Sequence, residues 1–85
     1  MGKLNFGLMG YRFNTDKNWL SYKSIYGKSF RVLLADIESA SVTEGGRGKA
    51  RLLVNGKGTT LAEVELPRPW ANKAQEFVLK EIGKL

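Results

Sequence analysis

The order of its segments constrains this 85-residue chain more than any other feature. Residues 4–66 form short runs in which apolar and polar side chains alternate, as expected of half-buried β-strands. Residues 67–85 then place apolar side chains at the i, i+4, i+7 spacing of an amphipathic helix. A small antiparallel sheet leaves one end open, which a helix can cover. The order therefore predicts a mainly β fold, an antiparallel, partly closed barrel or sheet over about residues 4–66, capped by a C-terminal helix at about residues 69–83.

Turn signals divide the first part of the chain into strands. The pair Asn55-Gly56 is typical of a type I′ hairpin, whose two central residues both need a positive φ. Alternation predicts strands within residues 4–13, 19–26, 30–34, 37–43, 50–54 and 60–66, which makes six, or seven if Gly10 splits the first run. We expect the core to contain Phe30, Val32, Leu34, Ile37, Leu52, Val54, Val64, Leu66, Trp70, Ala74, Phe77, Val78 and Ile82.

Composition limits the chemistry. The chain has no Cys and no His, so it forms no disulfide and lacks the commonest general base and metal ligand. Glu63 and Glu65 share an outward strand face and are expected to solvate it, because acid–base catalysis by paired carboxylates needs burial. We therefore expect a single non-enzymatic domain over residues 1–85, with no metal and no cofactor. No apolar run reaches the ~20 residues of a membrane span, and residues 1–9 lack a signal-peptide pattern, so a cytoplasmic location is expected.

Three segments in order resemble bacterial pleckstrin-homology-like (PH-like) domains. They are LLADIESASV at residues 33–42, the glycine hairpin VNGKGTTLAEV at residues 54–64, and a closing helix with Phe77 near its middle. The resemblance covers residues 20–83 and implies a seven-strand barrel closed by a helix. In that family, basic residues near an early hairpin often hold lipid phosphates. The resemblance thus implies an anion-binding role for Lys23, Lys28 and Arg31.

Charge suggests a second group of candidate anion ligands. The formal net charge is +6, and Arg47, Lys49 and Arg51 gather on a later hairpin. The segment GGRGK at residues 45–49 lacks the spacing of a phosphate-binding loop and is expected to be a hairpin tip. Trp19, Tyr22 and Tyr26 lie among lysines, which is compatible either with base stacking or with ordinary packing in the core. If both basic groups lie at one end of the fold, the case for a polyanion ligand becomes stronger.

Apolar residues on predicted outer faces suggest a different function. Alternation places Leu33, Leu53 and Leu61 opposite the core, and an exposed apolar patch usually marks a contact surface. The leading prediction is therefore a small module for protein–protein interaction or self-assembly. The alternative is a polyanion binder, with anionic lipid headgroups or single-stranded nucleic acid as its ligand. Salt distinguishes them, because phosphate contacts weaken steeply with ionic strength and an apolar interface does not.

Overall fold

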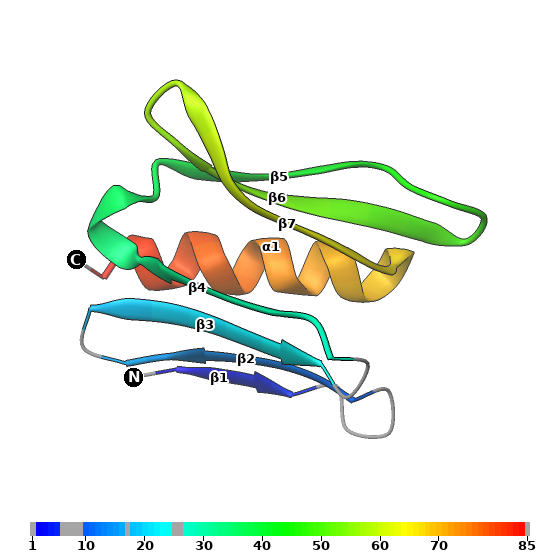
Figure 1. The fold of residues 1–85 in the computed structure, drawn as a ribbon, viewed down its shortest axis with the longest axis horizontal. Coiled ribbons are helices and arrows are strands. Elements are labelled where there is room, and N and C mark those ends of the chain that lie inside the picture. The colour runs from blue at the N-terminus through cyan, green and yellow to red at the C-terminus, as the bar shows by residue number, and fades with distance from the viewer. Residues whose placement is uncertain (1, 6–9, 17, 25–26, 85) are drawn as a thin grey trace.

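The computed structural model describes residues 2–5, 10–16, 18–24 and 27–84 (Figure 1). The N-terminal sheet is antiparallel and has the order β1-β2-β3-β4, with β1 at Lys3–Asn5, β2 at Tyr11–Thr15, β3 at Trp19–Ser24 and β4 at Ser29–Leu33. The 3-10 helix η2 (Leu34–Asp36) leads into the antiparallel C-terminal sheet, with β5 at Ser39–Glu44, β6 at Lys49–Gly56 and β7 at Thr59–Pro67. Helix α1 (Arg68–Ile82) follows, with Pro69 in its first turn.

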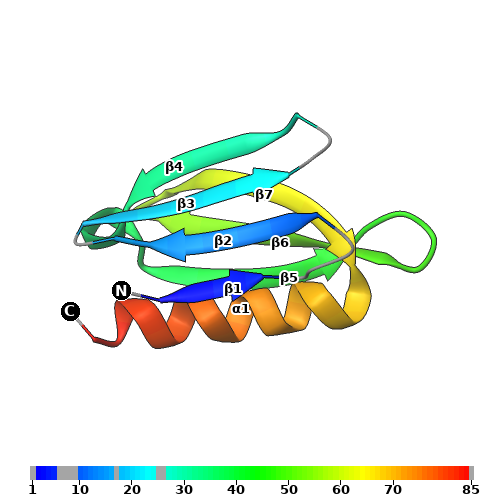
Figure 2. The same ribbon diagram turned by 90° about the horizontal axis from the view of Figure 1, so that it is seen from below.

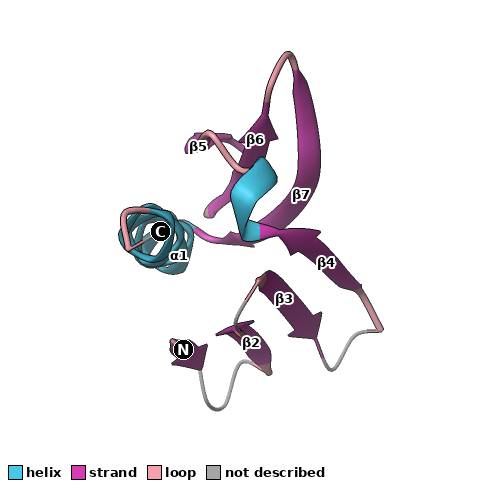
Figure 3. Cartoon of the chain, turned by 90° about the vertical axis from the view of Figure 1, so that its left-hand side faces the viewer, coloured by secondary structure: helices cyan, strands magenta, loops and turns pink. Residues whose placement is uncertain are grey.

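The two sheets and the helix enclose one core. Seen end-on, the sheets form two arms, with β4 near β7 on one side and α1 filling the opposite side (Figure 3). Gln75 of α1 donates a hydrogen bond to the carbonyl of Ala40 on the edge strand β5, over 3.0 Å. Each sheet keeps its own set of paired strands, so the sheets are not closed into a barrel. The prediction of an antiparallel, partly closed sheet capped by a C-terminal helix is confirmed.

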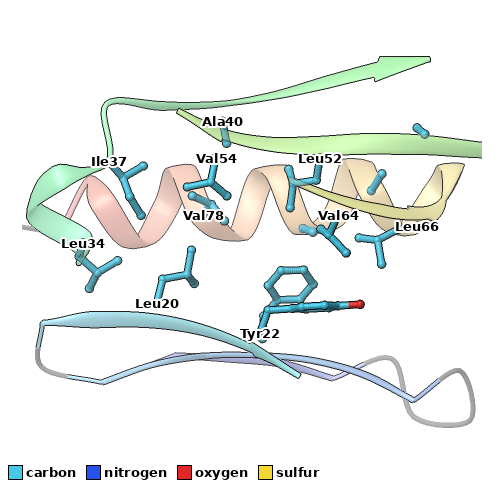
Figure 4. Close-up of a cluster of buried hydrophobic side chains, with 14 residues drawn as sticks. Leu20, Tyr22, Leu34, Ile37, Ala40, Leu52, Val54, Val64, Leu66 and Val78 are labelled. Carbon is cyan, nitrogen blue, oxygen red and sulfur yellow. The ribbon is translucent and has the colours of Figure 1, made fainter. Parts of the chain in front are cut away.

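The core contains side chains from all three layers (Figure 4). Leu20 and Tyr22 of β3 face Leu52 and Val54 of β6, and Val78 of α1 packs beside them. Eight predicted core residues are buried, namely Leu34, Ile37, Leu52, Val54, Val64, Leu66, Ala74 and Val78. The other five, Phe30, Val32, Trp70, Phe77 and Ile82, are half-buried and pack around the rim. Six buried hydrophobic residues were not predicted, namely Phe13, Leu20, Tyr22, Ala40, Ala50 and Ala71.

The β6–β7 hairpin differs from the sequence prediction. Strand β6 continues through Asn55 and Gly56, and the turn consists of Lys57 and Gly58. Among residues 55–58, only Gly58 has a positive φ, of 71°, so the prediction of a type I′ turn at Asn55-Gly56 was wrong. Gly56 has a steric role instead, since a Cβ there would lie 3.0 Å from the carbonyl oxygen of Asp36. This close approach explains the glycine better than turn geometry does.

Other element boundaries shift by a few residues. Strand β2 extends to Thr15, two residues past the predicted end at residue 13. Residues 34–36 form η2, so the fourth predicted strand begins at Ser39 rather than near Ile37. Gly10, with φ 74°, precedes β2, and the first run is split into β1 and β2 as in the seven-strand alternative. The end of the predicted strand 19–26 lies outside the described residues.

A buried polar network joins the helix to the N-terminal sheet. Thr15 donates from its hydroxyl to Oε1 of Glu81, and Lys84 Nζ donates to Oε2 over 2.8 Å. The amide of Gly2 donates to the Thr15 hydroxyl oxygen over 2.6 Å. The hydrogen bonds from Lys84 and Thr15 hold the pKa of Glu81 below its usual value of 4.5. Glu81 is 6% exposed, so its charge is held in place by these partners.

Candidate anion-binding site

The outer face of the N-terminal sheet carries one basic residue on each strand. Leu4, Phe13, Tyr22 and Phe30 lie opposite one another across the sheet and point toward the core. Because side chains alternate along a strand, their neighbours point outward. These neighbours include Lys3, Arg12, Lys23 and Arg31, all exposed, and we call this surface the basic face. In Figure 2 the strands that carry it lie in front of the rest of the described chain.

Strand register places the four cations next to one another. Arg12 is directly opposite Lys23 in the β2–β3 pair. Lys3 is opposite Asn14, one outward position from Arg12, and Arg31 is opposite Ser21, one outward position from Lys23. Directly opposed side chains have Cβ atoms about 5 Å apart, and diagonal neighbours lie about 7–8 Å apart. The cations therefore form a continuous band across all four strands.

No acidic residue lies within these four strands, and exposed Asp16 directly follows β2, where its backbone pairs with that of Trp19. The four strands read KLN, YRFNT, WLSYKS and SFRVL, with four basic residues and no Asp or Glu. All eight acidic residues of the chain lie elsewhere in the sequence. Like charges opposite each other destabilise a sheet, by roughly 0.2–1 kcal/mol on an exposed face. The folded state therefore maintains a positive surface at some cost in stability, and an anionic partner would relieve that cost.

An aromatic residue borders the band. The Arg31 guanidinium lies 4.3 Å from the centroid of the Trp19 ring, a cation–π arrangement. Trp19 is half-buried and pairs with Leu33, which is 37% exposed. Asn14 and Ser21 lie in the same row as Arg31 and add amide and hydroxyl groups. The face thus combines positive charge, hydrogen-bonding groups and an aromatic ring.

A second group of cations lines an open cleft between the sheets. Lys28, Lys49 and Arg51 border a space of about 440 Å³, together with Glu63 and Glu65. Arg51 Nε lies 3.6 Å from Glu63 Oε1, and Glu65 accepts a hydrogen bond of 3.0 Å from the Gly46 amide. Two carboxylates therefore offset much of the positive charge of the three cations. The lining of the cleft is therefore less positive than the basic face.

The structure divides the six predicted anion ligands between separate places. Lys23 and Arg31 belong to the basic face, while Lys28, Lys49 and Arg51 line the cleft. Arg47 is exposed in the turn between β5 and β6, so the GGRGK segment includes a hairpin tip as predicted. Of the predicted ligands Lys23, Lys28 and Arg31, Lys28 is the one that lines the same cleft as Lys49 and Arg51.

Sequence reasoning missed Lys3 and Arg12. The signal for Arg12 was present, since it stands between Tyr11 and Phe13 in an alternating run. Alternation alone does not predict which residue of a neighbouring strand stands opposite Arg12. The importance of Arg12 comes from its position opposite Lys23, which depends on the register of the β2–β3 hairpin.

The three predicted contact leucines do not share one outward surface. Leu33 lies on the outer face of the N-terminal sheet, whereas Leu53 is half-buried on β6 of the C-terminal sheet. Leu61 packs against the core, so its assignment to a face opposite the core was wrong. The register shifts where Val54 pairs with Ala62 but Asn55 pairs with Thr60. This β-bulge leaves Leu61 between the paired positions and breaks the alternation.

The aromatic group is also divided. Tyr22 is 3% exposed and stacks on Phe30 inside the core, with ring centroids 5.3 Å apart, so it is not available to a base. Burial raises the pKa of Tyr22 above its usual value of 10.0. Tyr26 lies outside the described residues. Trp19 is the member of this group that the structure places at the basic face.

No protein-family model, curated protein or solved structure matches the chain in our comparisons. Across the described ranges, no helix is long and apolar enough to cross a membrane. In the same part of the chain, no three Asp or Glu side chains gather as a metal-binding group would require. The function must therefore be inferred from the basic face itself.

Proposed function

We propose that this chain is a non-enzymatic, PH-like binding module whose basic face holds a phosphate-bearing polyanion. The single observation that carries the proposal is the band of Lys3, Arg12, Lys23 and Arg31 on strands with no acidic residue. The PH-like assignment is supported by the sequence resemblance and by the order of seven strands followed by one helix. In this structure strand pairing, rather than a loop, sets the backbone positions of all four cations.

Electrostatics support a polyanion over a single anion. The direct opposition of Arg12 and Lys23 costs free energy in the unbound protein. A ligand with several linked phosphates neutralises neighbouring cations at once and releases counterions from itself. Binding should therefore be strongest at low ionic strength and should fall steeply as salt is added.

The test measures binding at about 50 and about 300 mM salt, between which the Debye length roughly halves. The probes are inorganic polyphosphate, a fluorescent single-stranded oligonucleotide and phosphatidylserine vesicles. We expect binding to at least one probe at low salt. The double variant Arg12→Ser/Lys23→Ser should make the negative slope of log K against log salt shallower, by about 0.7 for each lost contact with a single strand.

The matched control is Lys73→Ser/Lys80→Ser, which removes the same charge from exposed positions on α1. If this control weakens binding as much as the variant of the basic face does, net charge drives binding and the proposal is wrong. The same conclusion follows if none of the probes binds at low salt.

A protein-interaction or self-assembly module is the second candidate. The observation that favours it is a cleft of about 400 Å³ between the edge strands β4 and β7. It is lined on one side by Lys28, Ser29 and Phe30 and on the other by Leu61, Ala62 and Glu63. Exposed strand edges can accept an added strand. Sedimentation equilibrium tests self-assembly directly. A monomer at every accessible concentration would rule out that form of the second candidate.

A further inference from the structure

From the geometry of the basic face, we infer that its ligand is a single strand of nucleic acid, which crosses the four strands and stacks a base at Trp19. This inference rests on the proposed function and narrows it to one class of polyanion. Three features of the face support it: the shape of the cationic band, the aromatic ring at its border and the polar groups in between.

The band is long in one direction and narrow in the other. It has one cation per strand, and neighbouring strands lie about 4.8 Å apart, so it extends about 14 Å across the sheet. Along the strands it occupies only two adjacent outward rows, that of Arg12 and Lys23 and that of Lys3 and Arg31. A linear chain of phosphates fits such a track. A planar anionic surface would also contact the next outward row, where the described residues are Trp19, Leu33 and Asp16 and include no cation.

The aromatic ring lies where a base would stack. Trp19 and Leu33 form the outward row next to that of Arg31, and the Arg31 guanidinium already lies over the indole. Bases stack both on aromatic rings and on arginine planes, largely without regard to sequence. A phosphate on the band would therefore place its base within reach of this Trp19–Arg31 pair.

Polar side chains complete the surface. Asn14 and Ser21 stand between Lys3 and Arg31 in one row, and Asn14 is exposed. An amide offers both a donor and an acceptor, and a hydroxyl does the same. Base edges need such partners, whereas binding to a membrane surface is strengthened by apolar side chains that insert below the lipid headgroups. On this face, the described large apolar residue that counts as exposed is Leu33 alone.

The experiment compares two fluorescent strands of equal charge by anisotropy at low salt. One is an oligothymidylate of about ten nucleotides, a length within the range that single-strand binding folds cover. The other is an abasic strand of the same length, which keeps the phosphates and removes the bases. We expect the full-length protein to bind the thymidylate at least about fivefold more tightly, because each stacked base contributes to affinity.

Variants at Trp19 assign the preference to this residue. Trp19→Leu keeps an apolar contact with Leu33 and should reduce the thymidylate preference to near one. Trp19→Phe keeps a ring and should retain much of it. Leu33→Ala is the neighbouring control and should preserve the preference. Circular dichroism confirms that each variant is folded, and if Trp19→Leu does not fold, the abasic strand still decides whether the bases contribute to binding.

Each result has one interpretation. If the wild-type protein binds the abasic strand as tightly as thymidylate, base stacking is wrong while polyanion binding stands. If phosphatidylserine vesicles bind and neither strand does, the ligand is a membrane surface and the inference fails. If neither strands nor vesicles nor polyphosphate bind at low salt, the proposed function fails as well.

Discussion

Replacing Lys23 with glutamate should stabilise the fold and weaken polyanion binding in the same protein. In the wild-type sheet, Lys23 stands directly opposite Arg12, so two positive charges oppose each other on an exposed face. The substitution turns this like-charge pair into an opposite-charge pair. Lysine and glutamate both have low β-propensity, so the change in charge dominates the effect.

The size of the effect follows from the exposure of the pair. Removing a repulsion and adding an attraction each contribute roughly 0.2–1 kcal/mol across a strand pair, and solvent screening keeps exposed pairs near the low end. We expect a gain in unfolding free energy of about 0.5–1 kcal/mol at low salt. For a domain of this size, that gain raises Tm by about 2–8 °C. In about 1 M salt the Debye length is about 3 Å, and most of the gain should disappear.

Thermal melts followed by circular dichroism, at low and high salt, measure the stability change, and anisotropy with a labelled single strand measures binding. The control Lys73→Glu makes the same charge change on α1 and should alter stability by no more than about 0.5 kcal/mol. A loss of stability in Lys23→Glu, or a gain that persists in high salt, would show that Arg12–Lys23 repulsion is not a property of the native sheet. The aliphatic stem of Lys23 would then matter more than its charge.

Three further outcomes test the fold. Leu52→Ala removes a fully buried side chain between the layers and should lower the free energy of unfolding in urea by about 2–5 kcal/mol. Phe77→Ala removes a half-buried side chain and should lower it less, by about 2 kcal/mol. Because the pKa of Glu81 is lowered in the folded state, its stabilising contribution is present above the unfolded value of 4.5 and is lost as the pH falls through the folded pKa. Thermal melts across acidic pH should show this loss of stability. Glu81→Gln should make stability depend less on pH in that range. Gly58→Ala should cost about 1–2 kcal/mol because its φ is 71°, while Gly46→Ala, in an exposed turn without a positive φ, should be nearly neutral in the same assay.

Alternation in the sequence predicted the two-part architecture and the direction of most strand side chains. It placed Lys23 and Arg31 outward, and the structure agrees. It did not predict register, because the pairing of β2 with β3 is set by the connection between Thr15 and Trp19. The candidate site exists only through that register, since the band depends on Arg12 standing opposite Lys23.

The errors have a common physical cause, which is that local patterns do not report tertiary contacts. Continuous alternation places Leu61 outward, but a bulge interrupts the alternation at this residue. Asn55-Gly56 seemed a turn because its composition suits one, yet Gly56 is needed for close contact with Asp36. Phe13 and Tyr22 were omitted from the core because nothing in their own segment shows that a second sheet covers them.

The two open sheets of this fold have four strand edges, which bear on its tendency to aggregate. Unpaired edges recruit strands from other molecules, and natural proteins shorten, cover or charge them. Here β1 has only three residues and begins with a lysine, and β5 is covered by α1 through the Gln75–Ala40 hydrogen bond. The edges of β4 and β7 turn toward each other, with Lys28 and Glu63 beside the gap. Edge-to-edge polymerisation is thereby disfavoured at β1 and β5, and the open gap between β4 and β7 is the place left for an added strand.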